Sequence, residues 1–223
     1  MSKPVLVIRH NYLLYAMDEL NKTSFIFLRH GEPVGGKKFR GSTDDPLTEK
    51  GWRQMQAAIK DLSYDEVISS PLKRCAAFSE KIHLQTGVPY RQHKDLQEMH
   101  LGEWEGLLPA QVEVLDKKAL YAFWEDPVKN TPPGGECFSD FESRVMTVWD
   151  KLKKDCMSKE QSKVVLVVCH AGVMMVLLKA LLQIPMKNIL MLKLNFASKV
   201  RIEVFDESYQ LKPQIYIDHG YTF

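Results

Sequence analysis

FIFLRHGE, residues 25–32, is the stretch that decides the fold class. It opens with four apolar residues rich in strand formers, and a second apolar run, VVLVV at 164–168, likewise does not alternate with polar residues. Continuous runs of this kind are typical of strands that are covered on both faces of a sheet. Val67 and Ile68 form a weaker strand candidate. Each of the three leads into a helix-like segment, and this alternation predicts an α/β fold.

Two helices are expected in the first half of the chain. Thr48 can cap a helix that runs to Leu62. Ser70 and Pro71 have the character of an N-cap and a first helical residue, opening a helix to about residue 85 that Gly87 ends.

The second half predicts two more helices and a strand-rich tail. Residues 171–182 are heavily apolar and indicate a buried helix. Residues 139–142 fit a capping box, followed by one apolar helical stripe: Phe141, Val145, Val148, Trp149 and Leu152. The tail is expected to add antiparallel strands at the sheet edge, from residues 191–194, 200–205 and 214–217.

These elements combine into a single three-layer α/β/α sandwich, with a mixed, mostly parallel sheet and helices on both faces. The main domain is expected to span residues 23–223, with an insertion at about 107–138 in which residues 125–137 form a loop. Residues 1–22 are treated as an N-terminal extension of unknown role.

Composition narrows the classes of function. Thirty Lys and Arg against 28 Asp and Glu leave a formal net charge of +2, so nucleic-acid binding driven by bulk charge is not expected. No stretch approaches the roughly 18 uninterrupted apolar residues of a membrane span. The cysteines are scattered, without the spacing of a zinc knuckle or a disulfide framework, which favours a reducing, cytoplasmic location: Cys75, Cys137, Cys156 and Cys169.

Arginines and histidines gather where the predicted strands end. Arg29 and His30 follow the first strand. Arg74 lies on the first turn of the helix after the second strand, and His170 follows the third. Ligands of open α/β sheets bind at the carboxyl ends of strands, and arginine forks and helix N-termini bind phosphate oxygens. A neutral imidazole among such cations can attack phosphorus and form a phosphohistidine that water hydrolyses.

The motifs around these residues resemble those of the histidine phosphatase superfamily, which has the phosphoglycerate-mutase-like fold. They occur in family order over about residues 24–205: RHGE at 29–32, SPLKR at 70–74, LQE at 96–98 leading to GEWEG at 102–106, and CHAG at 169–172. The resemblance implies that His30 is the nucleophile and that Glu98 donates a proton to the leaving oxygen. It also implies a phosphate pocket formed by Arg29, Arg74 and a catalytic His170. This chemistry needs no metal or other cofactor.

Neighbouring residues compete for these roles. His10 also follows a strand-like run, but no glycine comes after it. Glu103 and Glu105 lie close to Glu98 in sequence and are expected to face solvent or to pair locally. His100, beside two of these carboxylates, would suggest a metal site, but no third imidazole or cysteine lies near it in sequence.

Departures from the family pattern bear on the reaction and the substrate. Phe78 stands where relatives often carry a threonine, which removes a hydroxyl near the pocket wall. Gly35 and Gly36 stand where the mutases place Trp-Asn, which favours hydrolysis over mutase activity. Residues 124–145, with WEDP and PPGGE, resemble the alpha-ribazole phosphatase branch, which dephosphorylates a precursor of the cobalamin nucleotide loop. The resemblance implies α-ribazole 5'-phosphate as the substrate.

Substrate choice is expected to depend on a wall around the phosphate pocket. Its candidate residues, besides the insertion, are Arg40, Thr43 and Trp104. Trp104, Phe123 and Trp124 offer flat apolar surfaces for a base, although core packing is the alternative interpretation for the first two. Arg40 and the lysines at 37–38 would attract the anion.

The leading hypothesis is therefore a metal-independent phosphomonoesterase that hydrolyses a small phosphorylated metabolite. Two alternatives stay open: a broad-specificity or protein phosphatase, and a catalytically idle relative that binds phosphorylated ligands. The expected partner is the small-molecule substrate, and neither nucleic acid nor a membrane is expected. The sequence leaves the oligomeric state open, with a homodimer as one arrangement.

Overall fold

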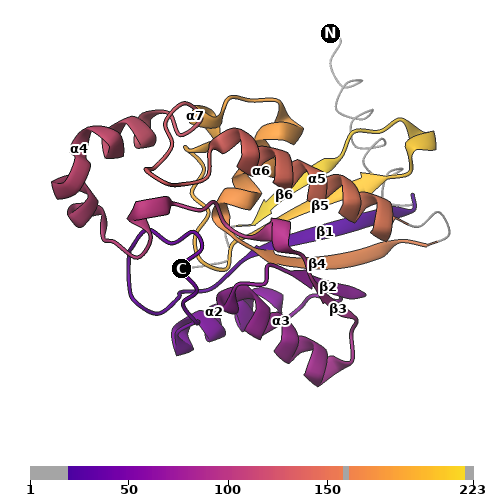
Figure 1. The fold of residues 1–223 in the computed structure, drawn as a ribbon. Helices are drawn as coiled ribbons and strands as arrows, with labels where there is room; N and C mark the ends of the chain where they lie inside the picture. The colour runs from indigo at the N-terminus through magenta and orange to yellow at the C-terminus, as the bar shows by residue number, and fades with distance from the viewer. Residues whose placement is uncertain (1–19, 158–160, 219–223) are drawn as a thin grey trace, which may run out of the picture.

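A six-stranded sheet with the strand order β3-β2-β4-β1-β5-β6 forms the centre of the protein. The computed structural model describes residues 20–157 and 161–218; His10 and residues 1–19 of the proposed extension lie outside the described residues. The strands, drawn as arrows in Figure 1, are β1 (Lys22–Arg29), β2 (Glu66–Ser69), β3 (Tyr90–Gln92), β4 (Lys163–Cys169), β5 (Lys199–Phe205) and β6 (Gln214–Asp218).

The inner strands are parallel, and the edge that the tail adds is antiparallel. β1 pairs in parallel with β4, β4 with β2, and β2 with β3. β5 runs antiparallel to β1, and β6 runs antiparallel to β5. This confirms the mixed sheet and two of the predicted tail strands. The third, 191–194, is wrong, because the backbone N–H groups of Met191 and Leu192 donate back to Asn188 and Ile189 and form a turn.

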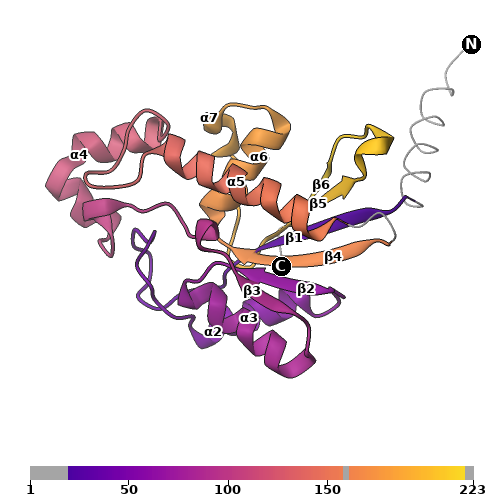
Figure 2. The same cartoon turned by 45° about the vertical axis from the view of Figure 1, so that its right-hand side comes forward.

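Helices cover both faces of the sheet (Figures 1 and 2). They are α2 (Glu49–Ile59) and α3 (Lys73–Thr86) on one face, and α5 (Phe138–Cys156), α6 (Ala171–Leu182) and α7 (Met186–Ile189) on the other. Side chains alternate along a strand, so Phe25 and Phe27 of β1 pack with α5 and α6, whereas Ile26 and Leu28 pack with α2 and α3. The predicted α/β/α sandwich is confirmed.

Two helices follow the prediction closely. Thr48 caps α2, its hydroxyl accepting a hydrogen bond from Gly51 N at 2.9 Å, although this helix ends at Ile59 and not at Leu62. α6 has the predicted bounds, and Gly87 ends α3 in the left-handed conformation that glycine accepts without strain.

Two helix starts differ from the prediction. α3 begins at Lys73 after the N-cap Leu72, although the Ser70 hydroxyl accepts from Leu72 N at 3.3 Å as a cap would; the same hydroxyl lies 2.8 Å from the His170 ring. α5 begins at Phe138, so Ser139 is already helical and no side chain caps the helix. Phe138 is 3% exposed, and its burial in the core favours the earlier start.

The insertion at 107–138 contains α4 (Pro109–Glu125), which projects from the sandwich on the side where β1 ends (Figures 1 and 2). α4 bends at Asp116, whose backbone angles (φ −152°, ψ 82°) are not helical. Val112 and Leu120 pack its inner side against Trp104. Within residues 20–157 and 161–218, no helix has both the length and the apolar character that crossing a bilayer requires.

Candidate active site

The carboxyl ends of β1, β2 and β4 lie side by side, and two histidines predicted for the site, His30 and His170, lie close together there. His30 N donates to the carbonyl of Cys169, and Ser70 N donates to the carbonyl of Val168, both at 3.0 Å. These bonds extend the parallel ladder past the strand ends. The rings of His30 and His170 therefore lie close together, with centroids 5.2 Å apart and an interplanar angle of 62°.

His30 is held as a neutral ring with its proton on Nδ1. That nitrogen lies 2.8 Å from the carbonyl oxygen of Gly31. A carbonyl can only accept, so Nδ1 donates and Nε2 keeps its lone pair. Burial lowers the pKa of His30 well below its ordinary value, and the positive charges of Arg74 and Arg29 lower it further. His30 lines a cavity of about 310 Å³, where such an imidazole can act as a nucleophile.

Arg74 and His170 are completely buried and hydrogen-bonded to each other. Arg74 Nε donates to His170 Nδ1 at 3.3 Å, and His170 Nε2 lies 2.8 Å from the hydroxyl of Ser70. Because Nδ1 accepts, the ring proton is on Nε2. Burial lowers the pKa of His170 well below its ordinary value, and the charge of Arg74 adds to this effect. Neither residue lines the cavity, so their contact with a phosphate stays a prediction.

Arg29 lines the cavity and keeps an unpaired donor. Its Nη1 donates to the carbonyl of Leu194, and its guanidinium carbon lies 4.5 Å from the ring centroid of Phe196. Its Nε is buried and has no hydrogen-bond partner among the described residues. An unpaired buried donor costs about 1–3 kcal/mol, and a phosphate oxygen would satisfy it.

Glu98 lines the same cavity and is fixed by two backbone amides. Its Oε1 accepts from Met99 N at 3.2 Å, and its Oε2 accepts from Gly172 N at 3.1 Å. Burial raises the pKa of this carboxyl, although the two hydrogen bonds oppose the rise. A carboxyl that holds its proton beside a nucleophile can act as a general acid.

Arg144 holds the chain around Glu98, a role that was not predicted from the sequence. Its Nη1 donates to the carbonyls of Asp95 and Gln97 at 2.9 and 2.7 Å, and its Nη2 donates to the carbonyl of Glu98 at 3.0 Å. Its Nε and Nη2 also donate to the two carboxylate oxygens of Glu136, at 2.6 and 2.9 Å. The sequence signal that could have indicated this ion pair was Glu136, just before the start of α5, and Arg144, two turns into the helix.

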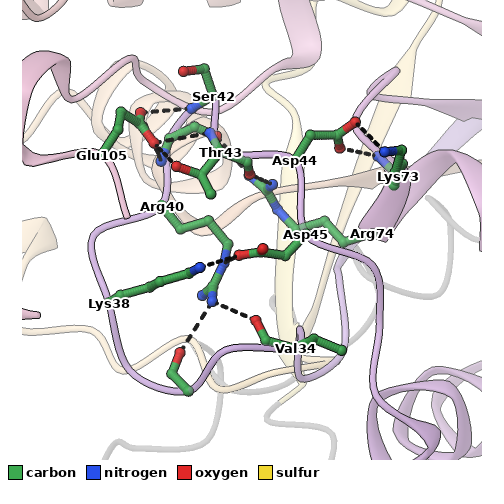
Figure 3. A network of polar contacts seen from close by, with 12 residues as sticks. Val34, Lys38, Arg40, Ser42, Thr43, Asp44, Asp45, Lys73, Arg74 and Glu105 are labelled. Carbon is green, nitrogen blue, oxygen red and sulfur yellow. Dashed lines mark hydrogen bonds and ion pairs between the residues drawn. The ribbon is translucent and has the colours of Figure 1, made fainter. Parts of the chain in front are cut away.

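Glu105 pairs locally, as expected, by accepting from Leu101 N at 3.0 Å, but it also bonds to a distant loop. Its carboxylate accepts from the backbone N–H groups of Gly41, Ser42 and Thr43 and from the Thr43 hydroxyl (Figure 3). Burial alone would raise the pKa of Glu105, but these hydrogen bonds hold it below its ordinary value. The carbonyls of Thr43 and Gly41 in turn accept from Arg74 at 2.7 and 2.8 Å. Glu105 thus positions Arg74 through this loop.

The three wall candidates lie in different places. Arg40 lines the cavity, and its guanidinium donates to Asp45 Oδ2 at 2.7 Å and to the Val34 carbonyl at 2.8 Å (Figure 3). Thr43 does not line the cavity and bonds to Glu105 instead. Trp104 does not line it either, being only 3% exposed.

Aromatic residues of the α4 region divide between core and cavity. Trp104 packs against Phe39 and Phe123 in a small core, with ring centroids 5.3 and 5.5 Å away. Trp124, 48% exposed, lines the cavity.

Phe78 lies in the core between α2 and α3, with its ring 5.6 Å from that of Trp52, so it contributes to packing there. Within the described ranges, no three His, Cys, Asp or Glu side chains are grouped to hold a metal ion.

A methyl group at position 172 is expected to displace Glu98. An alanine Cβ there would lie 2.2 Å from Glu98 Oε1, so the carboxyl would have to shift. Gly172 is not among the positive-φ glycines, and the backbone of α6 can accept alanine. We expect Gly172→Ala to lower kcat on alkyl phosphates by about 10- to 100-fold, with a lower Tm but a chain that is still folded at the assay temperature. Steady-state kinetics and thermal unfolding measure the two effects, and an unchanged kcat would show that the carboxyl position is not critical.

Comparison with known proteins finds relatives over most of the chain. The model of the histidine phosphatase superfamily (branch 1) matches residues 25–214. Glucosyl-3-phosphoglycerate phosphatase of Mycobacterium tuberculosis is 30% identical over 172 residues, covering 73% of this chain and 77% of the relative. Adenosylcobalamin/alpha-ribazole phosphatase of Salmonella typhimurium is 30% identical over 164 residues, covering 71% and 79%. The native structure of a mycobacterial glucosyl-3-phosphoglycerate phosphatase matches with a TM-score of 0.77 at 27% identity, covering 89% of this chain and 99% of that one.

Proposed function

Because this chain belongs to the histidine phosphatase superfamily (branch 1) and is a phosphatase, we propose that it hydrolyses a small phosphomonoester through a phosphohistidine at His30. One observation carries this proposal: a neutral His30 and a carboxyl with a raised pKa, Glu98, line one cavity. The attacking nitrogen, His30 Nε2, must carry no proton and the Glu98 carboxyl must carry one, and burial favours both of these protonation states. No metal or other cofactor enters the proposed reaction.

The proposed reaction has two steps. In the first, the lone pair of His30 Nε2 attacks phosphorus, the bond from phosphorus to the ester oxygen breaks, and the leaving oxygen takes the proton of Glu98. In the second, the Glu98 carboxylate accepts a proton from water as the water oxygen attacks phosphorus. The phosphorus–nitrogen bond then breaks, its electron pair returns to Nε2, and inorganic phosphate leaves.

Arg29, Arg74 and His170 are proposed to form the phosphate pocket. The unpaired Nε of Arg29 supports its part most directly. Arg74 carries a positive charge close enough to lower the pKa of His30, so it would also stabilise negative charge on a phosphoryl group there. His170 is proposed to contact that group from the neighbouring strand end.

We propose α-ribazole 5'-phosphate as the first substrate to test. It is supported by the sequence of residues 124–145, by the relative named adenosylcobalamin/alpha-ribazole phosphatase, and by the half-exposed ring of Trp124, a flat surface for a base. Glucosyl-3-phosphoglycerate is the second candidate, because a relative of equal identity is named for it.

A substrate panel tests both the reaction and the substrate. Phosphate release by the full chain is measured with EDTA present, on α-ribazole 5'-phosphate, glucosyl-3-phosphoglycerate, 3-phosphoglycerate, p-nitrophenyl phosphate and a phosphohistidine protein. We expect kcat/KM for α-ribazole 5'-phosphate to exceed the others at least about tenfold, or ~1.4 kcal/mol. A smaller preference would indicate a general phosphatase, and a higher value for glucosyl-3-phosphoglycerate would replace the first candidate. No turnover on any ester would leave the idle relative as the better hypothesis.

A further inference from the structure

A second cavity, of about 260 Å³, adjoins the catalytic cavity and differs from it in chemistry. Both are lined by Arg40, Glu98 and Trp124. Beyond these three, the catalytic cavity carries the cations of Arg29 and the lysines at 37–38. The second cavity carries none of these among the described residues, and its wall is apolar, including Leu101, Phe123, Met175, Met186 and Leu190.

The wall of the second cavity is partly open to water. Leu190, just after α7, is 41% exposed, and Trp124 on α4 is 48% exposed. Met175 of α6 is partly buried beside the core. Covering such side chains with an apolar group is favourable, because it removes both surfaces from water.

Glu98 connects the two cavities chemically. Its backbone partners Met99 and Gly172 both line the second cavity, whereas His30 lines the catalytic one. With phosphorus at His30 and the leaving oxygen at Glu98, the carbon atoms attached to that oxygen would enter the second cavity. The order of groups along a phosphate ester therefore matches the order of groups along the two cavities.

We infer that the second cavity is a leaving-group subsite that takes the apolar alkyl or aryl part of a phosphomonoester. The inference rests on the proposed function, because it requires phosphorus at His30. A leaving group with many hydroxyls, such as that of the second candidate glucosyl-3-phosphoglycerate, fits this subsite less well than the base of α-ribazole 5'-phosphate, since the polar groups at the boundary are already bonded. Arg40 donates to Asp45 and to the Val34 and Gly36 carbonyls, and both oxygens of Glu98 accept from backbone amides.

Binding of n-alkylphosphonates tests the subsite without any chemistry. These ligands carry a phosphonate that cannot be hydrolysed and a chain whose length sets the apolar area. We expect Kd, measured by calorimetry on the full chain, to fall by up to about fourfold for each methylene from methyl to hexyl, the equivalent of ~0.8 kcal/mol. A Kd that does not depend on chain length would overturn the proposal.

Adjacent residues provide a variant and its control. Leu190→Asn puts a neutral amide on the wall without adding charge, and it should reduce the gain per methylene to less than about twofold. Leu190→Ala should have a smaller effect in the same direction. Met191→Asn is the matched control, because Met191 is 83% exposed and lines neither cavity. A full chain-length effect in Leu190→Asn would contradict the subsite.

Hydrolysis of the matching n-alkyl phosphates separates this inference from the proposed function. These alcohols have nearly equal pKa values, so a rise of kcat/KM with chain length reports binding and not protonation. Hydrolysis with no dependence of phosphonate Kd on chain length would refute the subsite and keep the phosphatase. Phosphonate binding that improves with length, without hydrolysis of any ester, would refute the proposed reaction and keep the subsite.

Discussion

Replacing His30 with alanine is expected to lower kcat by about 10⁴-fold or more. The proposed covalent intermediate forms on His30 Nε2, and among the described residues no other group is placed to replace it. His170, whose ring lies closest to His30 within these residues, has both ring nitrogens bonded, to Arg74 and to Ser70. Phosphate release from an aryl phosphate measures the effect, and circular dichroism checks that the variant is folded.

A trapping experiment identifies the residue that carries the phosphoryl group. The chain is mixed with labelled substrate and quenched in alkaline denaturant, because phosphohistidine is labile in acid, and peptides are then mapped by mass spectrometry. We expect the label on His30 in the unmodified chain and in His83→Ala, a control at an exposed position of α3. Label on His10 or His170, or turnover that survives in His30→Ala, would contradict the assignment.

The order of the central elements was accessible from sequence because their signals are local. β1 and β4 are continuous apolar runs, and the apolar content of 171–182 gave the bounds of α6. β3 was missed because three residues are too few to show a strand period. The start of α5 was misplaced because burial of Phe138 in the core overrides the local capping pattern, whereas Ser70 keeps its cap-like bond to Leu72 N although α3 begins only at Lys73.

In the site, too, residues within local sequence motifs could be predicted, whereas residues held by contacts distant in sequence could not. The motifs single out His30 and Glu98 because both lie in recognisable sequence, and in the structure both line one cavity. Glu105 could not be predicted as the residue that holds residues 41–43, because its partners are about sixty positions away in sequence. Trp104 and Trp124 are each followed by a glutamate in the sequence, but the fold places the first in a core and the second on a cavity.

Glu98→Gln is expected to lower kcat on alkyl phosphates by about 10²- to 10⁴-fold and on p-nitrophenyl phosphate by less than about tenfold. An alkoxide needs a proton as it leaves, whereas nitrophenolate leaves without one. Glutamine has nearly the same shape as glutamate but cannot transfer that proton. The ratio of the two losses, from steady-state kinetics on both substrates, therefore measures general-acid catalysis.

The pH profile gives a second readout of the same residue. Glu98 acts when protonated, so kcat on alkyl phosphates should fall as pH rises through its pKa, which burial raises above the ordinary value. His30 acts when neutral, and its lowered pKa keeps it neutral as pH falls below the ordinary histidine range. The alkaline loss should therefore be absent in Glu98→Gln, while the acid loss should stay where it is.

Comparing the loss of kcat on alkyl phosphates with the loss on p-nitrophenyl phosphate also separates general-acid catalysis from any structural change in Glu98→Gln. Both carboxylate oxygens of Glu98 accept from backbone N–H groups, so the amide nitrogen of glutamine would face a donor, an unpaired contact that costs about 1–3 kcal/mol. That strain would act on both substrates alike and leave the ratio of their losses unchanged. Glu103→Gln, at an exposed carboxylate five residues away in sequence, is the matched control and should alter neither rate. Equal losses on alkyl and aryl phosphates, with the alkaline loss still present, would show that Glu98 positions the site without donating the proton.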